Sequence, residues 1–376
     1  MRIFYKKHRI VRVLIRILIV IIVILFAAFM FLKFCPAFGG TASKEDKLDY
    51  KERAANYSDG KFRNEGDFSI LKNANGAIDN AISTKGSTPN EEIPIVEPTY
   101  LDESSSADFS VTWFGHSTLL IQMNGMNILI DPMFSEYASP VQLVGSKRFS
   151  TPLVSLDELP DIDVVLISHD HYDHLDYNTI MDIDDKVTSY VVPLGVENHL
   201  ERWGIASDRI QNMAWWEEIE VNGLTIGCTP AKHYSGRSLT DQYATLWASW
   251  VLKDDDFQVF ESGDTGFGNQ FEEIHNKYGD FDFAMLDCAQ YDVRWPDVHM
   301  NPEEAYKAAQ ILNSAVAMPI HWAAFQLANH PWDDPAERFV RASEGGNIPV
   351  VTPMIGETMK LNEYMKYRNL WWRNVD

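Results

Sequence analysis

The feature that most constrains this chain is the block Ser168–Asp176, which reads SHDHYDHLD. It follows Asp163–Ile167 (DVVLI), whose short, β-branched and uninterrupted apolar character predicts a buried strand. The residues after such a run lie on a loop at the end of a strand, where open metal sites are usually built. We therefore expect a sheet protein with a metal site at a strand end.

The spacing within this block indicates half of a two-metal site. His169 and His171 are two residues apart on an extended segment, so both rings can face one ion. Asp173 and His174 come one tight turn later and point elsewhere, toward a second ion. Neutral imidazole suits zinc, and a carboxylate completes a harder site. The alternative is a polar surface loop rich in histidine, but HxHxDH after a strand is more specific than a lone pair of histidines.

HxHxDH resembles the signature of the metallo-β-lactamase superfamily, whose remaining ligands can be sought downstream. They occur in order, as His233 in TPAKH, Asp264 in SGDTG and His321 in MPIH. Each alone would be a weak signal, because a single histidine is more often a core or surface residue than a ligand. Their order and local context together favour the resemblance.

Within that superfamily the chain resembles the group of N-acyl-phosphatidylethanolamine-hydrolysing phospholipases D and their bacterial relatives. The resemblance runs from about residue 110 to 335 and rests on SHDHYDHLDY together with Thr112–Ser117, Leu129–Pro132, Ala138–Pro140, Lys147–Phe149, Trp215–Glu217, Gly263–Gly266, Pro302–Ala305 and His321–Ala328. It implies an α/β fold, the four-layer αββα sandwich of the superfamily.

The resemblance also implies two zinc ions per chain. One would be held by His169, His171 and His233, the other by Asp173, His174 and His321, with Asp264 bridging them. A cysteine at position 264 would have indicated an antibiotic-hydrolysing lactamase. The carboxylate favours phosphodiesterases and thioesterases, although lactone hydrolases share the pattern, so a lactone or ester hydrolase stays as the alternative.

The resemblance further implies the reaction, hydrolysis of N-acyl-phosphatidylethanolamine to N-acylethanolamine and phosphatidic acid. Two zinc ions, two aspartates and a hydroxide sum to a charge of about +1, which complements a phosphodiester anion. No GxSxG or other covalent-catalysis motif is present. Asp264 is the central catalytic candidate, and His299 either protonates the leaving oxygen or only lines the pocket.

Two residues of the first predicted hairpin are candidates for supporting the ligands. His116 and Asp131 could hold a ligand or a bridging group in orientation. The alternative is that both are buried polar residues whose partners are backbone groups. Asp176 is interpreted as a loop cap rather than as a ligand.

The N-terminus predicts a membrane anchor. Ile17–Leu32 is uncharged and apolar, and extending it back to Ile10 adds only Arg12 and Arg16, which can snorkel toward the headgroups. The basic residues before it predict a single-pass protein with a cytoplasmic N-terminus and an extracytoplasmic catalytic domain. A cleaved signal peptide is the alternative. The expected organisation is an anchor over 1–33, a polar tether over 34–105 whose later part lies against the domain, and a hydrolase domain over 106–376.

Net charge bounds the partners. The chain carries −22, and residues 1–33 contain seven basic and no acidic residues, which leaves −29 on the remainder. So acidic a body repels nucleic acid phosphates and argues against the nucleases of the superfamily. The expected partner is a phospholipid substrate in the bilayer.

Elsewhere the pattern predicts strands interleaved with helices. The runs 118–123 and 126–130, joined by Asn124-Gly125, predict a tight hairpin. A helix is expected over Asn301–Leu312, where Asn301 can cap, Pro302 fits the first turn and Glu304 sits three residues after the cap. Further strands are expected at 189–193, 224–228, 245–252, 258–260, 281–286 and 315–320.

Overall fold

The computed structural model describes residues 2–72, 86–101, 109–150, 154–238 and 240–375. Helices span α1 Arg2–Phe34, α2 Lys44–Arg53, α3 Tyr177–Ile183, α4 Glu197–Trp203, α5 Gln270–Tyr278, α6 Pro302–Ile311 and α7 Asp334–Ala342. Strands span β1 Tyr57–Ser58, β2 Lys61–Phe62, β3 Ser110–Trp113, β4 Leu119–Met123, β5 Met126–Ile130, β6 Tyr137–Ala138, β7 Ser146–Lys147, β8 Ile162–Leu166, β9 Val187–Pro193, β10 Ile210–Met213, β11 Glu218–Val221, β12 Leu224–Thr229, β13 Ser249–Lys253, β14 Gln258–Glu261, β15 Phe283–Asp287, β16 Val316–Ile320 and β17 Thr358–Lys360.

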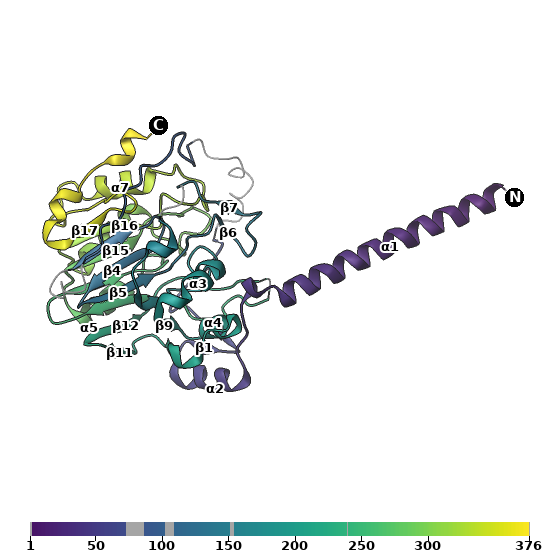
Figure 1. Cartoon of the computed structure of the whole chain (residues 1–376), viewed down its shortest axis with the longest axis horizontal. Helices are drawn as coiled ribbons and strands as arrows, with labels where there is room; N and C mark the ends of the chain where they lie inside the picture. The colour runs from purple at the N-terminus through teal and green to yellow at the C-terminus, as the bar shows by residue number, and fades with distance from the viewer. Residues whose placement is uncertain (1, 73–85, 102–108, 151–153, 239, 376) are drawn as a thin grey trace.

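Two large mixed sheets form the centre of the molecule (Figure 1). One has the order β10-β9-β8-β5-β4-β3-β17 and the other the order β11-β12-β13-β14-β15-β16. Parallel pairing holds β5, β8, β9 and β10 together in the first sheet, and β14, β15 and β16 in the second. The parallel strands put their carboxyl ends at one edge of each sheet, where loops can meet.

The apolar side chains define four layers. In β4, Leu119 and Ile121 pack into the core between the sheets, whereas Leu120 packs with the outer layer of α3 and α4. On the second sheet, Phe260 faces a separate core that contains residues of α5, α6 and α7. Because alternate side chains of a strand point to opposite faces, strands buried on both faces read as continuous apolar runs. The architecture is the expected αββα sandwich.

Local signals in the sequence are confirmed where they depend on near neighbours. Asn124 and Gly125 have φ of 54° and 70°, the two left-handed residues that a tight hairpin turn requires. Asn301 caps α6 by accepting from the Glu304 backbone at 3.0 Å, and the Glu304 carboxylate accepts from the Asn301 backbone at 3.1 Å. Asp176 caps α3, accepting from Thr179 N at 3.2 Å.

The segment expected to be a polar tether packs against the domain early in its course. Tyr50 and Phe62 are buried with Leu246 and Trp247 of the domain. Arg53 donates from Nε and Nη2 to the Glu217 carboxylate at 3.1 and 2.7 Å. The sequence places the later part of 34–105 against the domain, and the structure shows that the early part packs there as well. The few apolar residues of this stretch are isolated in sequence, and only the fold brings them into one cluster.

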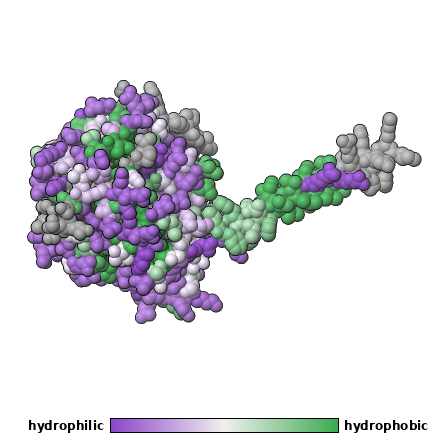
Figure 2. All heavy atoms as spheres, viewed as in Figure 1, coloured by the Kyte–Doolittle hydropathy of each residue, from purple (hydrophilic) through white to green (hydrophobic). Residues whose placement is uncertain are grey.

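Helix α1 projects away from the body, and its apolar surface contrasts with the largely hydrophilic body (Figures 1 and 2). Val11–Phe34 is long and apolar enough to cross a membrane, and none of it is buried against the protein. A membrane span and a signal sequence share these properties. The following residues are tied to the body: Ala37 O accepts two hydrogen bonds from Arg237, at 2.8 and 3.0 Å.

Candidate metal centre

Loops at the ends of strands carry the candidate ligands to one place. The SHDHYDH block follows β8, His233 follows β12, Asp264 follows β14 and His321 directly follows β16. The structure brings together all seven side chains expected as ligands, and they are buried or nearly so. Carboxyl-terminal strand ends from both sheets therefore build one site.

One group of donors consists of His169, His171, His233 and Asp264, whose ligand atoms all lie within 4.8 Å of one another. His171 Nδ1 lies 2.8 Å from His169 Nε2 and 3.3 Å from His233 Nε2. Asp264 Oδ2 lies 3.7 Å from both His169 Nε2 and His233 Nε2. This grouping matches the expected first site.

A second group of donors consists of His116, Asp173, His174 and His321, of which His174 and His321 also lie next to Asp264. His174 Nε2 lies 3.5 Å from Asp173 Oδ2 and 3.2 Å from Asp264 Oδ2. His321 Nδ1 lies 3.2 Å from Asp264 Oδ1. The Asp264 carboxylate thus faces both groups, as a bridging ligand must.

His116 and Asp131 contact the expected ligands directly. Asp131 Oδ2 lies 2.7 Å from His174 Nδ1, so the opposite ring nitrogen of His174 faces Asp264. Asp131 also accepts from Ser168 N at 2.7 Å and Ser168 Oγ at 2.5 Å. His116 Nε2 lies 2.9 Å from Asp173 Oδ2. Such contacts set ring orientation and ligand basicity, the usual work of groups around a metal site.

His299 lies at the edge of the cluster, paired with a carboxylate. Its Nδ1 is 2.9 Å from Asp287 Oδ2 and 3.9 Å from Asp264 Oδ2. Asp287, the last residue of β15, was given no role from the sequence. The sequence does carry a signal for Asp287, because this aspartate ends an apolar strand, much as Asp131 directly follows β5.

The backbone around the site is held in unusual conformations. His116, Asp131 and His321 have φ of 54°, 43° and 71°, in the left-handed region that non-glycine residues rarely adopt. His116 is joined to the two residues that follow β16, since His116 N donates to Trp322 O at 2.8 Å and His321 N to His116 O at 2.9 Å. Gly263 precedes Asp264 at φ 51°, and a Cβ there would come within 2.6 Å of Ala248 O.

The buried site contains both neutral imidazoles and an ionised carboxylate. Burial lowers the pKa of His169, His233 and His321 well below the ordinary value, so these rings are neutral at neutral pH. Burial acts the other way on Asp264, but the protonated ring of His174 beside it outweighs burial and holds the pKa of this carboxyl well below its usual range. Neutral imidazole and ionised carboxylate are the forms that bind metal.

The donor set fits metal ions. His174 Nε2 and Asp264 Oδ1 are buried, yet neither has a hydrogen-bond partner among the described residues. Buried polar atoms without partners are costly, and both of these face the centre of the cluster. A cation between the two groups would satisfy them.

A cavity of about 310 Å³ opens beside the cluster. Its polar lining includes His171, Asp173, His233, Asp264, His299 and His321. Ile70, Ala138, Trp295, Val298 and Leu327 contribute apolar walls. The cavity can therefore take a molecule with a charged group joined to an apolar part.

Comparison with known proteins shows the family of the chain. Residues 126–322 match the family described as the beta-lactamase superfamily domain. The chain belongs to this superfamily. Its relatives and fold identify it as a metal-dependent hydrolase.

Its relatives include characterised and uncharacterised proteins. Proteins of Mycobacterium tuberculosis and Mycobacterium bovis described as uncharacterized are 40% identical over 291 residues, which cover 76% of this chain and 77% of theirs. The N-acyl-phosphatidylethanolamine-hydrolyzing phospholipase D 1 of Caenorhabditis elegans is 33% identical over 247 residues, 62% of this chain and 69% of that protein.

Among solved structures, a metallo hydrolase from the archaeon Ignicoccus hospitalis superposes with a TM-score of 0.53 at 21% identity, covering 67% of this chain and 97% of that one. At this identity the likeness supports the fold alone.

Proposed function

We propose that this protein is a membrane-anchored dinuclear zinc phosphodiesterase that hydrolyses N-acyl-phosphatidylethanolamine or a closely similar lipid. The observation that carries the proposal is the pair of donor groups that both lie next to Asp264 and contribute to the lining of a part-apolar cavity. The relative from Caenorhabditis elegans, named for hydrolysis of that lipid, supports the substrate class.

The proposed ligand roles follow the geometry. His169, His171 and His233 would hold one ion, Asp173, His174 and His321 the other, and Asp264 both. When bound, a pair of zinc ions polarises a phosphodiester and acidifies water. Asp131 and His116 would keep His174 and Asp173 in place, because each contacts its partner within 2.9 Å.

His299 is proposed to deliver the proton that the leaving group needs. It lines the cavity, and its Nδ1 lies 2.9 Å from Asp287 Oδ2. Water adds to phosphorus, the bond from phosphorus to the ethanolamine oxygen breaks, and that oxygen takes a proton. The products are phosphatidic acid and N-acylethanolamine.

The assay that tests the proposal uses the full chain in detergent with added zinc. N-acyl-phosphatidylethanolamine in ¹⁸O-enriched water should yield N-acylethanolamine and phosphatidic acid with one ¹⁸O on phosphorus. A parallel assay offers an acyl lactone and a simple carboxylic ester. Hydrolysis of only the lactone or the ester would overturn the proposal in favour of the alternative hydrolase class.

We also propose that α1 spans the membrane once, with its basic N-terminus in the cytoplasm and residues 34–376 outside it. The seven basic residues among 1–33 and the apolar span Val11–Phe34 support this. Alkaline phosphatase fused after Asp376 is expected to be active in intact bacterial cells, because it folds only after export. Activity of a cytoplasmic reporter at that position instead would show the reverse orientation.

A further inference from the structure

The segment from Phe62 to Lys72, here called the N-terminal strap, runs along the edge of the metal centre. It lies outside residues 126–322, the part matched by the superfamily. Both ends are attached to the domain: Phe62 N donates to Tyr243 O at 2.9 Å and Lys72 N to Arg294 O at 3.0 Å. Between them, Ile70 forms part of the cavity wall.

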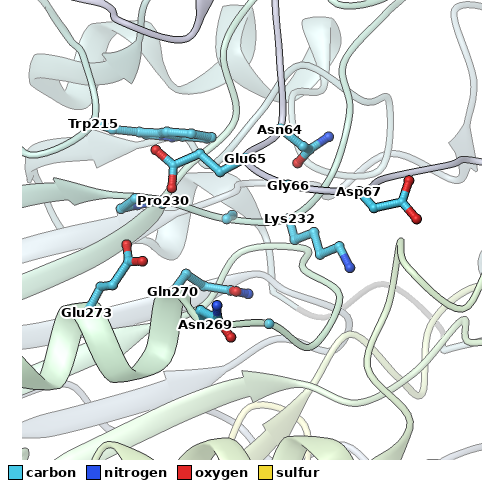
Figure 3. Close-up of a pocket in the computed structure, with 12 residues that line it drawn as sticks. Asn64, Glu65, Gly66, Asp67, Trp215, Pro230, Lys232, Asn269, Gln270 and Glu273 are labelled. Carbon is cyan, nitrogen blue, oxygen red and sulfur yellow. The ribbon is translucent and has the colours of Figure 1, made fainter.

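Asn64 of the strap binds the backbone of His233. Its Nδ2 donates to His233 O at 2.6 Å, and its Oδ1 accepts from His233 N at 3.1 Å. A side-chain amide carries one donor group and one acceptor, so it can satisfy both peptide groups of one residue. Figure 3 shows Asn64, Glu65 and Asp67 on the strap, which passes Lys232, the residue before His233.

The other contacts of His233 show why the position of its backbone matters for the position of its imidazole. Its Nδ1 faces Val298 O at 3.1 Å, which directs Nε2 toward His171 and Asp264. Lys232 N donates to Thr265 Oγ1 at 2.8 Å, beside Asp264. The imidazole is therefore fixed by the domain, whereas the main chain of His233 is fixed by the strap.

The far end of the strap is attached to the loop that carries His299. Asp297 accepts from Ser69 N at 3.1 Å and pairs with Lys72 Nζ at 2.6 Å and Lys232 Nζ at 3.2 Å. This carboxylate links the strap, the His233 loop and the His299 loop. Asn64 is consequently held at a defined place rather than on a free chain.

We propose that Asn64 is a positioning residue for the metal centre, acting by holding the backbone of His233. The proposal rests on the proposed role of His233 as a metal ligand. Loss of a group that orients a ligand weakens metal binding by about 10- to 100-fold. Asn64→Ala should therefore bind metal this much more weakly while the fold is retained.

The test is titration of the metal-free full chain in detergent with Co²⁺, followed by its visible absorption, and with Zn²⁺ in competition. The variants are Asn64→Ala and the smaller change Asn64→Asp, which keeps the acceptor and loses the donor. Asn56→Ala is the matched control, since Asn56 lies in the same N-terminal region and donates to Arg63 O at 3.0 Å in an exposed position. His233→Ala is the reference for loss of the ligand.

The expected result is weaker binding and a shifted Co²⁺ spectrum for both Asn64 variants, with Asn56→Ala like the wild type. A merely structural role would lower the melting temperature without moving the spectrum. If His233→Ala weakens binding and neither Asn64 variant does, the inference is wrong and the metal centre stands. If His233→Ala itself binds metal normally, the proposed function fails as well.

Discussion

Replacing Asp264 by asparagine is expected to lower kcat/KM for N-acyl-phosphatidylethanolamine by roughly 10³-fold or more, corresponding to about 4 kcal/mol of transition-state stabilisation. The same variant should purify with less bound metal. Asp264 Oδ2 lies 3.2 Å from His174 Nε2 and 3.7 Å from the Nε2 atoms of His169 and His233. Asparagine keeps the shape of this side chain and removes the charge that faces both donor groups.

Kinetics and elemental analysis of the purified protein check this expectation. Asp255→Asn is the matched control, because this substitution makes the same chemical change at an exposed residue of the turn between β13 and β14. Near-ultraviolet circular dichroism establishes that Asp264→Asn is folded. If that variant has the kinetics and metal content of the wild type, the Asp264 carboxylate is not required for metal binding or catalysis.

Glu197→Gln is expected to abolish a loss of stability that the wild type undergoes as pH rises through neutrality. Glu197 is 8% exposed at the start of α4 and accepts from Tyr50 Oη and from Gly195 N, the latter at 2.6 Å. Burial raises the pKa of Glu197 from 4.5 to about 7. The folded protein therefore holds this proton over a pH range in which the unfolded chain has released it.

The sign of the effect follows from that difference in pKa. Stabilisation by the bound proton is complete below pH 4.5 and is lost as pH rises through about 7. A shift of this size corresponds to about 3 kcal/mol in the free energy of unfolding. The difference in unfolding free energy, wild type minus Glu197→Gln, should fall by about this amount between pH 4.5 and 8.

Urea unfolding of the full chain in detergent, followed by tryptophan fluorescence, measures that difference. Glu201→Gln, an exposed position of the same helix, is the control and should show no such trend. A difference that stays constant with pH would mean that Glu197 is ionised in the folded protein. Because Tyr50 comes from α2, the result also reports on how the N-terminal segment packs.

Local signals predicted local structure well, and non-local contacts account for the differences. The hairpin turn at Asn124-Gly125 and the cap at Asn301 depend on neighbours in sequence, and both were predicted. The strand expected over 245–252 begins only at Ser249, because Leu246 N and Ala248 N donate to Leu194 O and Ser168 O instead of to a neighbouring strand. Those acceptors lie on other loops, which the pattern of the run itself cannot reveal.

The residues of the site likewise fall into those that the sequence predicted and those that it did not. The expected ligands could be named because the HxHxDH spacing and the order of the later motifs are properties of the sequence. Asn64 was missed because an asparagine in a polar segment has no distinctive spacing, and Asp287 was missed although it ends an apolar strand. His199 and His330, to which the sequence assigned nothing, are buried against Asp170 and Gln290 N, at 3.3 and 2.9 Å.

The amino-acid sequence alone determined the superfamily, the alternation of apolar strands with helices and the residue types of the candidate metal ligands. These follow from residue type and short-range spacing, which the linear chain carries. Only the tertiary structure decided which histidines share a centre, that Asp264 faces both groups and that residues 34–72 pack on the domain. These side chains come together because of the strand order in two sheets and the burial of distant segments against one another. No single stretch of sequence encodes either.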